Sequence, residues 1–293
     1  MFDSTAPSPP LDEPQARELD AIVELLAGRS ITALTGAGLS TDSGIPDYRG
    51  PTTRNRTRSP IQHRDFLRSE EARARYWARA MVGWVRFRGA EPNPAHAALA
   101  RLEREGSLRG IVTQNVDRLH TRAGSRRVIE LHGALERVRC LDCGAITARD
   151  RVQERLAVAN PSYAAWAAND AAAMAPDGDA DVSDAAVRAF EVVGCEACGG
   201  TLKPDVVFFG DNVARPVVDE AFALVEGSEA LLVAGTSLTV FSGFRFVRRA
   251  AERGIPVVLV NLGETRGDPL ATRRLDAPVG VVLPALADRL LRA

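Results

Sequence analysis

Short apolar runs recur along the chain and predict the strands of a buried sheet. Five such runs occupy Ile31–Thr35, Gly110–Thr113, Val128–Leu131, Ala230–Ala234 and Val257–Val260. They lack the strict alternation of apolar and polar residues that marks a strand with one solvent-exposed face. We therefore expect parallel strands that are buried on both faces.

Stretches with apolar residues three and four positions apart lie between these runs and predict amphipathic helices. The pattern occurs in Pro14–Arg29, Pro94–Arg104, Pro216–Val225 and Ser242–Arg253. Strands that alternate with helices in this way are typical of a doubly wound, parallel α/β sheet of the Rossmann-like type. That fold class is the one we expect.

Composition and charge exclude several classes of protein. Hydrophobic residues make up 45% of the chain, charged residues 26%, and the formal net charge is −1. No apolar run reaches the roughly 18 residues of a membrane-spanning helix, and the near-zero net charge argues against nucleic acid as a main partner. The acidic, proline-containing stretch Met1–Glu18 has no hydrophobic segment. We therefore expect neither a signal nor a transit peptide, and a cytoplasmic location.

Two Cys-x-x-Cys pairs contain all four cysteines of the chain: Cys140 with Cys143, and Cys195 with Cys198. In a reducing compartment such pairs are expected to hold one tetrahedral zinc ion, and four thiolates leave no open position, so the zinc should be structural. The interval between the pairs is longer than the roughly 15 to 20 residues of a usual zinc ribbon. Two redox dithiols or four core cysteines are the alternatives.

The alternation of strands and helices stops between the two cysteine pairs, which predicts an inserted module. The expected organisation is a lead-in without regular structure at 1–13, the α/β domain over 14–136 and 202–293 with a small helical insertion near 51–93, and the zinc module over 137–201. Within the module, the Ala- and Asp-rich residues 164–184 predict a surface helix and loop.

A predicted strand leads directly into Gly36-Ala37-Gly38, which indicates a phosphate-binding loop. Glycines let backbone N–H groups approach a pyrophosphate, and a helix that starts after the loop would favour its negative charge. The dehydrogenase fingerprint is incomplete, because Thr41 replaces its third glycine and Arg54-Asn55-Arg56 stand where an acidic residue is required. A hydride-transferring enzyme is therefore disfavoured.

This loop and several further motifs resemble the sirtuin family, in the family's order. They are Gly36-Ala37-Gly38-Leu39-Ser40 with Gly44-Ile45-Pro46-Asp47-Tyr48-Arg49, Thr113-Gln114-Asn115-Val116-Asp117, Leu131-His132-Gly133, the four cysteines, the run from Lys203 to Asp211, Gly235-Thr236-Ser237-Leu238 and Asn261-Leu262-Gly263. The residues at 60–63 and 175–179 most resemble those of the class II branch, which includes sirtuin-4-like proteins of mitochondria. Tyr48, Asp211 and the long inter-cysteine segment depart from the commoner family pattern.

The resemblance implies an NAD-dependent protein lysine deacylase of the deacetylase type, with protein or peptide acyl-lysines as partners and no membrane. In that family NAD is consumed: the acyl oxygen attacks the ribose carbon that carries nicotinamide, and a base then activates a ribose hydroxyl. His132 is the expected base, because an imidazole has an ordinary pKa of about 6.5, and a core histidine is the alternative. Asn115 and Asp117 complete the expected catalytic set. Asp117 would favour cationic character at the ribose or cap the next helix.

The resemblance also assigns binding residues. Those expected to hold NAD are Gly36, Ala37, Gly38, Ser40, Pro46, Asp47, Tyr48, Arg49, Gln114, Asn115, Val116, Asp117, Gly235, Thr236, Ser237, Asn261, Leu262, Gly263 and Val279. Val206, Val207, Phe208, Phe209 and Gly210 are expected to pair with the substrate peptide as an added strand. Plain core packing is the alternative for Val279, Phe208 and Phe209.

Two other functions remain open from the sequence. Transfer of ADP-ribose to protein would use the same glycine loop and Asn115. A zinc-ribbon nucleic-acid module would use Arg54, Arg56, Arg58 and Arg64 as a basic stripe, which the net charge disfavours. The acyl preference is also open, because the Tyr76 and Arg79 pair lies one residue away from the carboxylate clamp of succinyl-type relatives.

Overall fold

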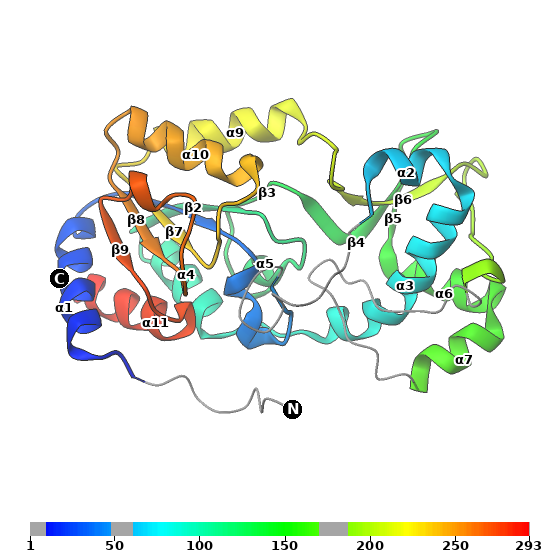
Figure 1. Ribbon diagram of the computed structural model, residues 1–293, viewed down its shortest axis with the longest axis horizontal. Coiled ribbons are helices and arrows are strands. Elements are labelled where there is room, and N and C mark those ends of the chain that lie inside the picture. Colours follow the sequence, from blue (N-terminus) through cyan, green and yellow to red (C-terminus); the bar gives the residue numbers. More distant parts are fainter. Residues whose placement is uncertain (1–9, 48–60, 170–186, 293) are drawn as a thin grey trace. The chain divides into compact units, whose positions relative to one another are not determined.

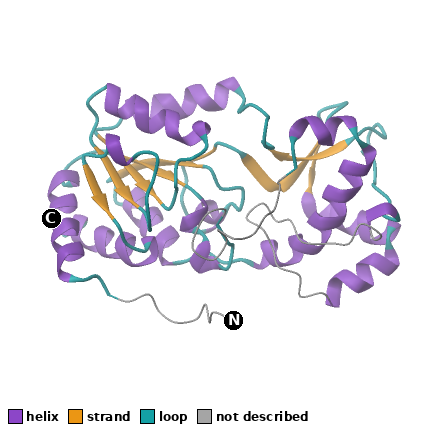
Figure 2. Cartoon of the chain, in the orientation of Figure 1, coloured by secondary structure: helices purple, strands orange, loops and turns teal. Residues whose placement is uncertain are grey.

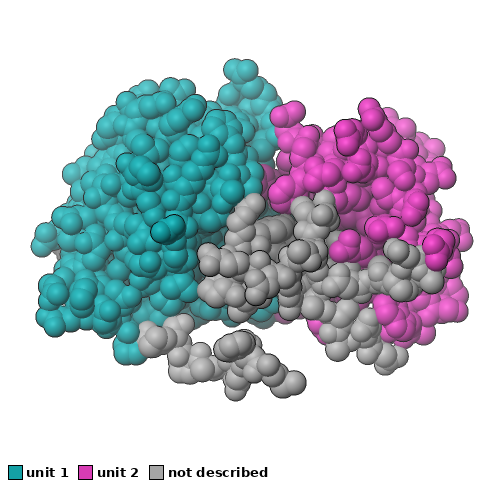
Figure 3. Space-filling model, viewed as in Figure 1, with its two compact units in different colours: residues 1–54, 91–131, 213–293 teal, residues 55–90, 132–212 magenta. Residues whose placement is uncertain are grey.

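The structure, a computed structural model, describes residues 10–47, 61–169 and 187–292. Packing divides the chain into two compact units, shown in Figure 3: unit 1 comprises 1–54, 91–131 and 213–293, and unit 2 comprises 55–90 and 132–212. The sequence predicts a helical insertion near 51–93 in the α/β domain. The contacts group its described part with the cysteine module instead, because Trp77 and Met81 share a core with Val138 and Leu202. The expected limits of the α/β domain, 14–136 and 202–293, and of the zinc module, 137–201, remain predictions.

Unit 1 is built on a parallel six-stranded sheet of order β3-β2-β1-β7-β8-β9 (Figure 1). Its strands are β1 (Ile31–Thr35), β2 (Leu108–Thr113), β3 (Val128–Glu130), β7 (Ala230–Ala234), β8 (Val257–Val260) and β9 (Arg273–Leu275). Every residue of β1, β7 and β8 is buried. The prediction of a parallel sheet buried on both faces is confirmed, and β9 is an additional strand.

Helices cover both faces of this sheet (Figure 2). One face packs against α1 (Glu13–Leu26), α4 (Pro94–Arg104) and α11 (Val279–Leu290), and the other against α9 (Arg215–Glu226) and α10 (Phe241–Glu252). Alternate residues of β1 supply the two cores, with Ala33 on the first and Leu34 on the second. Helix α1 begins where the sequence favours it, because the side chain of Asp12 accepts from the backbone N–H of Gln15 in a capping box.

Unit 2 contains an antiparallel sheet of order β5-β4-β6 with helices packed on it. The strands are β4 (Gly133–Cys140), β5 (Ile146–Ala148) and β6 (Leu202–Val206), and the helices are α2 (His63–Arg68), α3 (Glu70–Gly89), α6 (Arg149–Ala159) and α7 (Pro161–Asn169). Helix α7 covers the start of the stretch predicted as a surface helix and loop, and 170–186 lie outside the described residues. Among the described helices, none is both long and apolar enough to cross a membrane.

Candidate functional site

The carboxyl ends of β1 and β7 mark the point where the strand order of the unit 1 sheet reverses. From β1 the chain continues to β2 on one side, whereas β7 is followed by β8 on the other. Ligands of open α/β sheets bind outside the carboxyl ends of the strands at such a switch point. The two glycine loops predicted to hold NAD, 36–38 and 235–237, directly follow these two strands.

The two loops approach each other backbone to backbone. The N–H of Gly38 donates to the carbonyl of Gly235 at 2.9 Å. A Cβ on Gly36 would lie 2.7 Å from the Cβ of Thr236, and one on Gly235, whose φ is +63°, would lie 2.4 Å from the backbone nitrogen of Leu39. Side chains at these positions would force the loops apart, so the glycines are required by this contact as well as by any ligand.

The segment after the first glycine loop corrects one expectation. It forms two short 3₁₀ turns, η1 (Ala37–Leu39) and η2 (Thr41–Ser43), in place of the expected helix start. Gly44, at φ +80°, closes the second turn through its N–H bond to Thr41. The loop therefore has no α-helix dipole behind it.

A hydrogen-bond chain joins the first glycine loop to the residues that follow β2. The side-chain amide of Asn115 donates to the carbonyl of Gly36 at 3.1 Å and to Oγ of Ser40 at 3.0 Å, and Ser40 Oγ donates to Oδ2 of Asp117 at 2.7 Å. All three side chains are buried. The structure thus brings together Gly36, Ser40, Asn115 and Asp117, which the sequence analysis had assigned to one site.

Gln114 links the same strand end to the second glycine loop. Its Nε2 donates to Oγ1 of Thr236 at 3.0 Å and to the carbonyl of Thr35 at 3.2 Å. A Cβ on Gly243, at the start of α10, would lie 2.5 Å from Oε1 of Gln114. Sequence reasoning missed Gly243, because the need for a small residue arises from a contact between segments 129 positions apart in number.

Burial raises the pKa of the Asp117 carboxyl above its ordinary value, and the nearby charge of Glu130 acts in the same direction. Hydrogen bonds from the backbone N–H of Leu119 and from Ser40 oppose the shift. The bond to Leu119 satisfies the first N–H of α5 (Leu119–Arg122), but Arg118 and not Asp117 occupies the cap position of this helix. The Asp117 carboxylate remains available to oppose a developing positive charge nearby.

We expect Asp117→Asn to reduce nicotinamide exchange into NAD by about a hundredfold at neutral pH, because it removes the only charge of this network. In the unaltered protein, exchange should fall as the pH drops through the raised pKa, since the carboxylate is then neutralised. The variant should lack this limb of the pH profile.

The same variant should be the more stable one at neutral pH. A buried carboxyl with a raised pKa binds its proton more tightly in the folded state, so the free energy of unfolding decreases as the pH rises from the unfolded to the folded pKa. Thermal unfolding of both proteins, measured over the pH range between the unfolded and folded pKa values, tests whether stability decreases with pH only in the unaltered protein. Equal pH profiles for the two proteins would contradict the assigned role of Asp117.

The remaining residues predicted for NAD are spread over the same sheet edge. Asn261 uses its side-chain amide to bond the carbonyls of Leu262 and Gly263, so it shapes its own loop. Val279 is buried in a core cluster, in agreement with its alternative role. Pro46 and Asp47 are half-buried, whereas Tyr48 and Arg49 lie outside the described residues. Contact with NAD stays a prediction for all of these positions.

In unit 2, His132 is tied to the predicted substrate segment, which comprises residues 206–210. Its carbonyl accepts from the N–H of Val207 at 2.9 Å. Gly133, at φ +78°, allows this approach, because a Cβ there would lie 2.0 Å from the carbonyl oxygen of Asp205. The candidate base and the candidate peptide-binding segment are therefore held together within unit 2.

The other edge of the substrate segment contacts the start of α2. The carbonyl of Phe209 accepts from the N–H of His63 at 2.9 Å, and Nδ1 of His63 lies 3.2 Å from Oδ2 of Asp211. Phe208 is buried against Phe66, with ring centroids 5.2 Å apart, so it packs as core, the alternative considered for it. A substrate strand would have to use the backbone groups that these bonds leave available.

Of the other histidines, His96 and His120 are buried in unit 1, and their ring centroids lie 4.9 Å apart.

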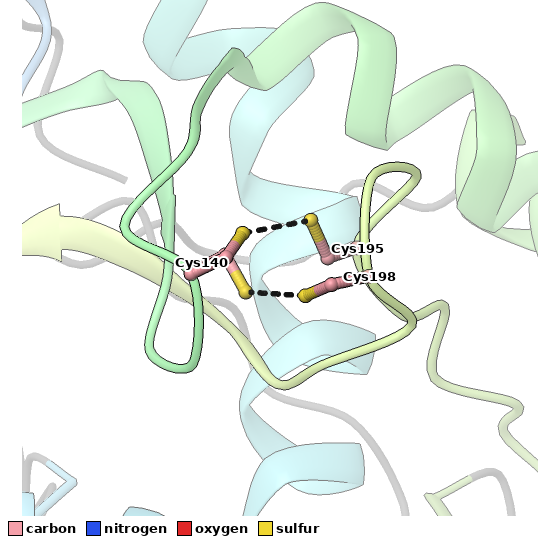
Figure 4. A group of neighbouring side chains, drawn as sticks. Cys140, Cys195 and Cys198 are labelled. Carbon is pink, nitrogen blue, oxygen red and sulfur yellow. Dashed lines mark hydrogen bonds between the residues drawn. The ribbon is translucent and has the colours of Figure 1, made fainter.

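The four cysteines converge in unit 2 (Figure 4). Their sulfur atoms all lie within 4.8 Å of one another, and the Sγ–Sγ distances are 3.6 Å for Cys140 with Cys198 and 3.8 Å for Cys143 with Cys195. A regular tetrahedron with metal–sulfur bonds of about 2.3 Å has edges of about 3.8 Å, whereas a disulfide needs about 2.05 Å. The four sulfur atoms therefore fit the ligand set of one zinc ion.

Each Cys-x-x-Cys pair forms the same tight turn. The carbonyl of Cys140 accepts from the N–H of Gly144 at 3.0 Å, the carbonyl of Cys195 accepts from Gly199 at 2.8 Å, and both glycines have φ of +74°. Both pairs therefore share one turn geometry. Backbone N–H groups of Cys143 and Asp142 lower the pKa of the Cys140 thiol, whereas contacts with the neighbouring thiols raise the pKa of Cys198, so protons are shared unevenly among the four sulfur atoms.

Comparisons with known proteins agree with these two sites. The family model described as "Sir2 family" matches residues 36–242. The chain is 49% identical over 282 residues to the human "NAD-dependent protein lipoamidase sirtuin-4, mitochondrial", which covers 95% of this chain and 88% of that protein. It is 49% identical to "NAD-dependent protein deacetylase 1" of Streptomyces coelicolor, over 94% of this chain and 91% of that one. A solved structure described as "Sir2-p53 peptide-NAD+" superposes with a TM-score of 0.73 at 31% identity, and covers 94% of this chain and 97% of the other.

Proposed function

The chain belongs to the Sir2 family of NAD-dependent protein deacylases, and we propose that it transfers the acyl group of protein acyl-lysines to ADP-ribose, with release of nicotinamide. The observation that carries the proposal is the network of Gly36, Ser40, Asn115 and Asp117 at the switch point of the sheet. In this network an amide and a carboxylate lie beside a glycine loop. A side chain at Gly36 would collide with Thr236 in the second glycine loop.

NAD, when bound, supplies the ribose–nicotinamide bond that the reaction breaks. The backbone of the two glycine loops would bind its phosphates, and Asn115 would orient the ribose through hydrogen bonds. Asp117 would stabilise positive charge at the ribose carbon as nicotinamide leaves. None of these steps requires the protein to oxidise or reduce the nucleotide.

In the second half of the reaction, His132 would remove a proton from a ribose hydroxyl, which then attacks the acyl carbon. The bond between the His132 carbonyl and Val207 supports this assignment, because it fixes the base relative to the segment proposed to bind the acyl-lysine peptide. The zinc ion would stabilise unit 2 and take no part in the chemistry, since the four cysteines fill its coordination.

The test is product analysis on a panel of acyl-lysine peptides that includes acetyl and lipoyl groups, since relatives are named both deacetylases and lipoamidases. Acyl-ADP-ribose formed in equal amounts with nicotinamide and free lysine peptide is the expected result. Attachment of ADP-ribose to a protein, without loss of an acyl group, would replace the proposal with ADP-ribosyl transfer, which uses the same glycine loop.

We also propose a reducing compartment, the cytoplasm, as the site of action. Four free cysteines arranged as zinc ligands support this location, because thiolates persist where glutathione keeps thiols reduced. Two animal relatives are named as mitochondrial. Fractionation of the source cells, with the tagged protein detected in the soluble cytosolic fraction, is the test.

A further inference from the structure

Lys203 is the only lysine of the chain, and its side chain is buried in unit 2. It projects from β6 and folds back under the residues that follow. Its Nζ donates to the carbonyl of Pro204 at 3.3 Å and to the carbonyl of Val206, and lies 4.4 Å from the centroid of the Phe208 ring. Buried ammonium groups are rare. Burial of this one lowers the stability of the fold unless hydrogen bonds and nearby charges offset the lost hydration.

The charges around Lys203 supply part of that compensation. Asp205 and Asp211 both favour its charged form, whereas Arg139 and burial disfavour it; burial is the largest effect and lowers the pKa of Lys203. The carboxylate of Asp205 is shared with Arg137 and Arg139, at 3.0 Å from each. Direct ion pairing to Lys203 is therefore weak, and its closest polar partners are backbone carbonyls.

These contacts fall on the substrate segment 206–210. Val206 begins it, Phe208 packs against Phe66 within it, and Val207 between them bonds His132. The ammonium thus fixes the two residues that flank the attachment point of the candidate base. Among the described residues, the positions predicted to hold NAD belong to unit 1.

We infer that Lys203 is a positioning residue for the acyl-lysine substrate: it holds the Val206 carbonyl and the Phe208 ring so that the segment 206–210 is preformed to receive the peptide. This inference rests on the proposed function. It predicts an effect on peptide binding that is separate from NAD binding. A residue that only stabilised the fold would affect both together.

The experiment compares Lys203→Met with Lys203→Arg and with Arg139→Met as a matched control. Lys203→Met keeps an unbranched apolar side chain and removes the ammonium group, so Kd and KM for the preferred acyl-peptide should rise by about tenfold or more, the range of a lost charged hydrogen bond. KM for NAD should change by less than about twofold. Lys203→Arg should restore most of the peptide affinity. Arg139→Met removes a neighbouring cation that does not touch the segment and should leave the peptide Kd unaltered.

Peptide Kd is measured by fluorescence anisotropy in the absence of NAD, so that binding is scored without turnover. Unchanged peptide affinity in Lys203→Met overturns the inference and leaves the proposed function intact. A parallel rise in the peptide and NAD constants also overturns it, in favour of a structural role. No binding of any acyl-peptide by the unaltered protein overturns both.

Amine labelling gives a second readout should Lys203→Met fail to fold. Because the chain has one lysine, an amine-reactive reagent can modify only Lys203 and the terminal amino group, and mass analysis separates the two. Labelling of Lys203 should be slow in the folded protein, and in the absence of NAD it should be slower still with acyl-peptide than without it. Labelling that the peptide does not slow contradicts the inference.

Discussion

His132→Ala is expected to reduce acyl transfer by about 10² to 10⁴-fold while nicotinamide exchange into NAD persists. The two activities should separate because the imidazole is needed only after nicotinamide has left, when a ribose hydroxyl must lose its proton. The measurement pairs two assays on one preparation: acyl-ADP-ribose formation by mass spectrometry, and incorporation of labelled nicotinamide into NAD with acyl-peptide present.

The structure makes this variant a clean test. The bond between His132 and Val207 is made by the backbone carbonyl, so truncation of the side chain leaves the substrate segment anchored. Zinc content and thermal unfolding should accordingly match the unaltered protein. Equal losses of exchange and acyl transfer would show that His132 acts earlier, or that it supports the fold, and would remove it as the base.

The sheet of unit 1 was predictable because its central strands are continuous apolar runs that can be recognised from local sequence alone. Ala230–Ala234 and Val257–Val260 are continuous apolar runs, and both form strands with the predicted bounds. Pro94–Arg104 is likewise the observed helix α4, with Asn93 as its cap. In such segments local propensity, burial and capping all favour the same structure.

Unit 2 was harder to predict because its strands and helices contain charged residues and proline, which are usually typical of exposed or irregular segments. Strand β6 holds Lys203 and Pro204, both unfavourable in a strand interior, yet both are buried. Helix α3 is rich in arginine, and its buried face is made of Trp77, Met81 and Trp84 between those charges. The antiparallel sheet β5-β4-β6 depends on pairing across the inter-cysteine segment, for which the sequence gives no local signal.

The candidate site shows the same division between motif and contact. The resemblance identified Ser40, Asn115 and Asp117, and the structure brings them into one hydrogen-bond chain in unit 1. The direction of each hydrogen bond in that chain follows from the folded geometry, and the raised pKa of Asp117 follows from burial. Neither could be derived from the spacing of the motifs. Gly243 acts through a tertiary contact with Gln114, and Lys203 through the way its side chain bonds the residues that follow it, so sequence reasoning gave neither a role.

Removal of zinc is expected to unfold unit 2 and abolish deacylation. Cys140 and Cys195 are buried in the same core cluster as Val138, Leu202 and Phe208, so the metal lies against the core that supports the substrate segment. Structural zinc sites contribute about 10 kcal/mol or more of binding free energy, comparable with the roughly 5 to 15 kcal/mol that stabilises a whole domain. Cys195→Ser should therefore lose zinc, unfold at a lower temperature and show no measurable acyl transfer.

The matched control for Cys195→Ser is Leu141→Ser, in the first Cys-x-x-Cys turn. Leu141 is an exposed apolar residue whose backbone N–H, and not its side chain, bonds Thr201. This variant should bind one zinc ion per chain and retain activity. Limited proteolysis should cleave Cys195→Ser within 132–212, whereas unit 1, which has its own two cores, stays protected. Full activity in zinc-free protein would contradict the structural role, because a unit that folds and turns over without the metal does not depend on it.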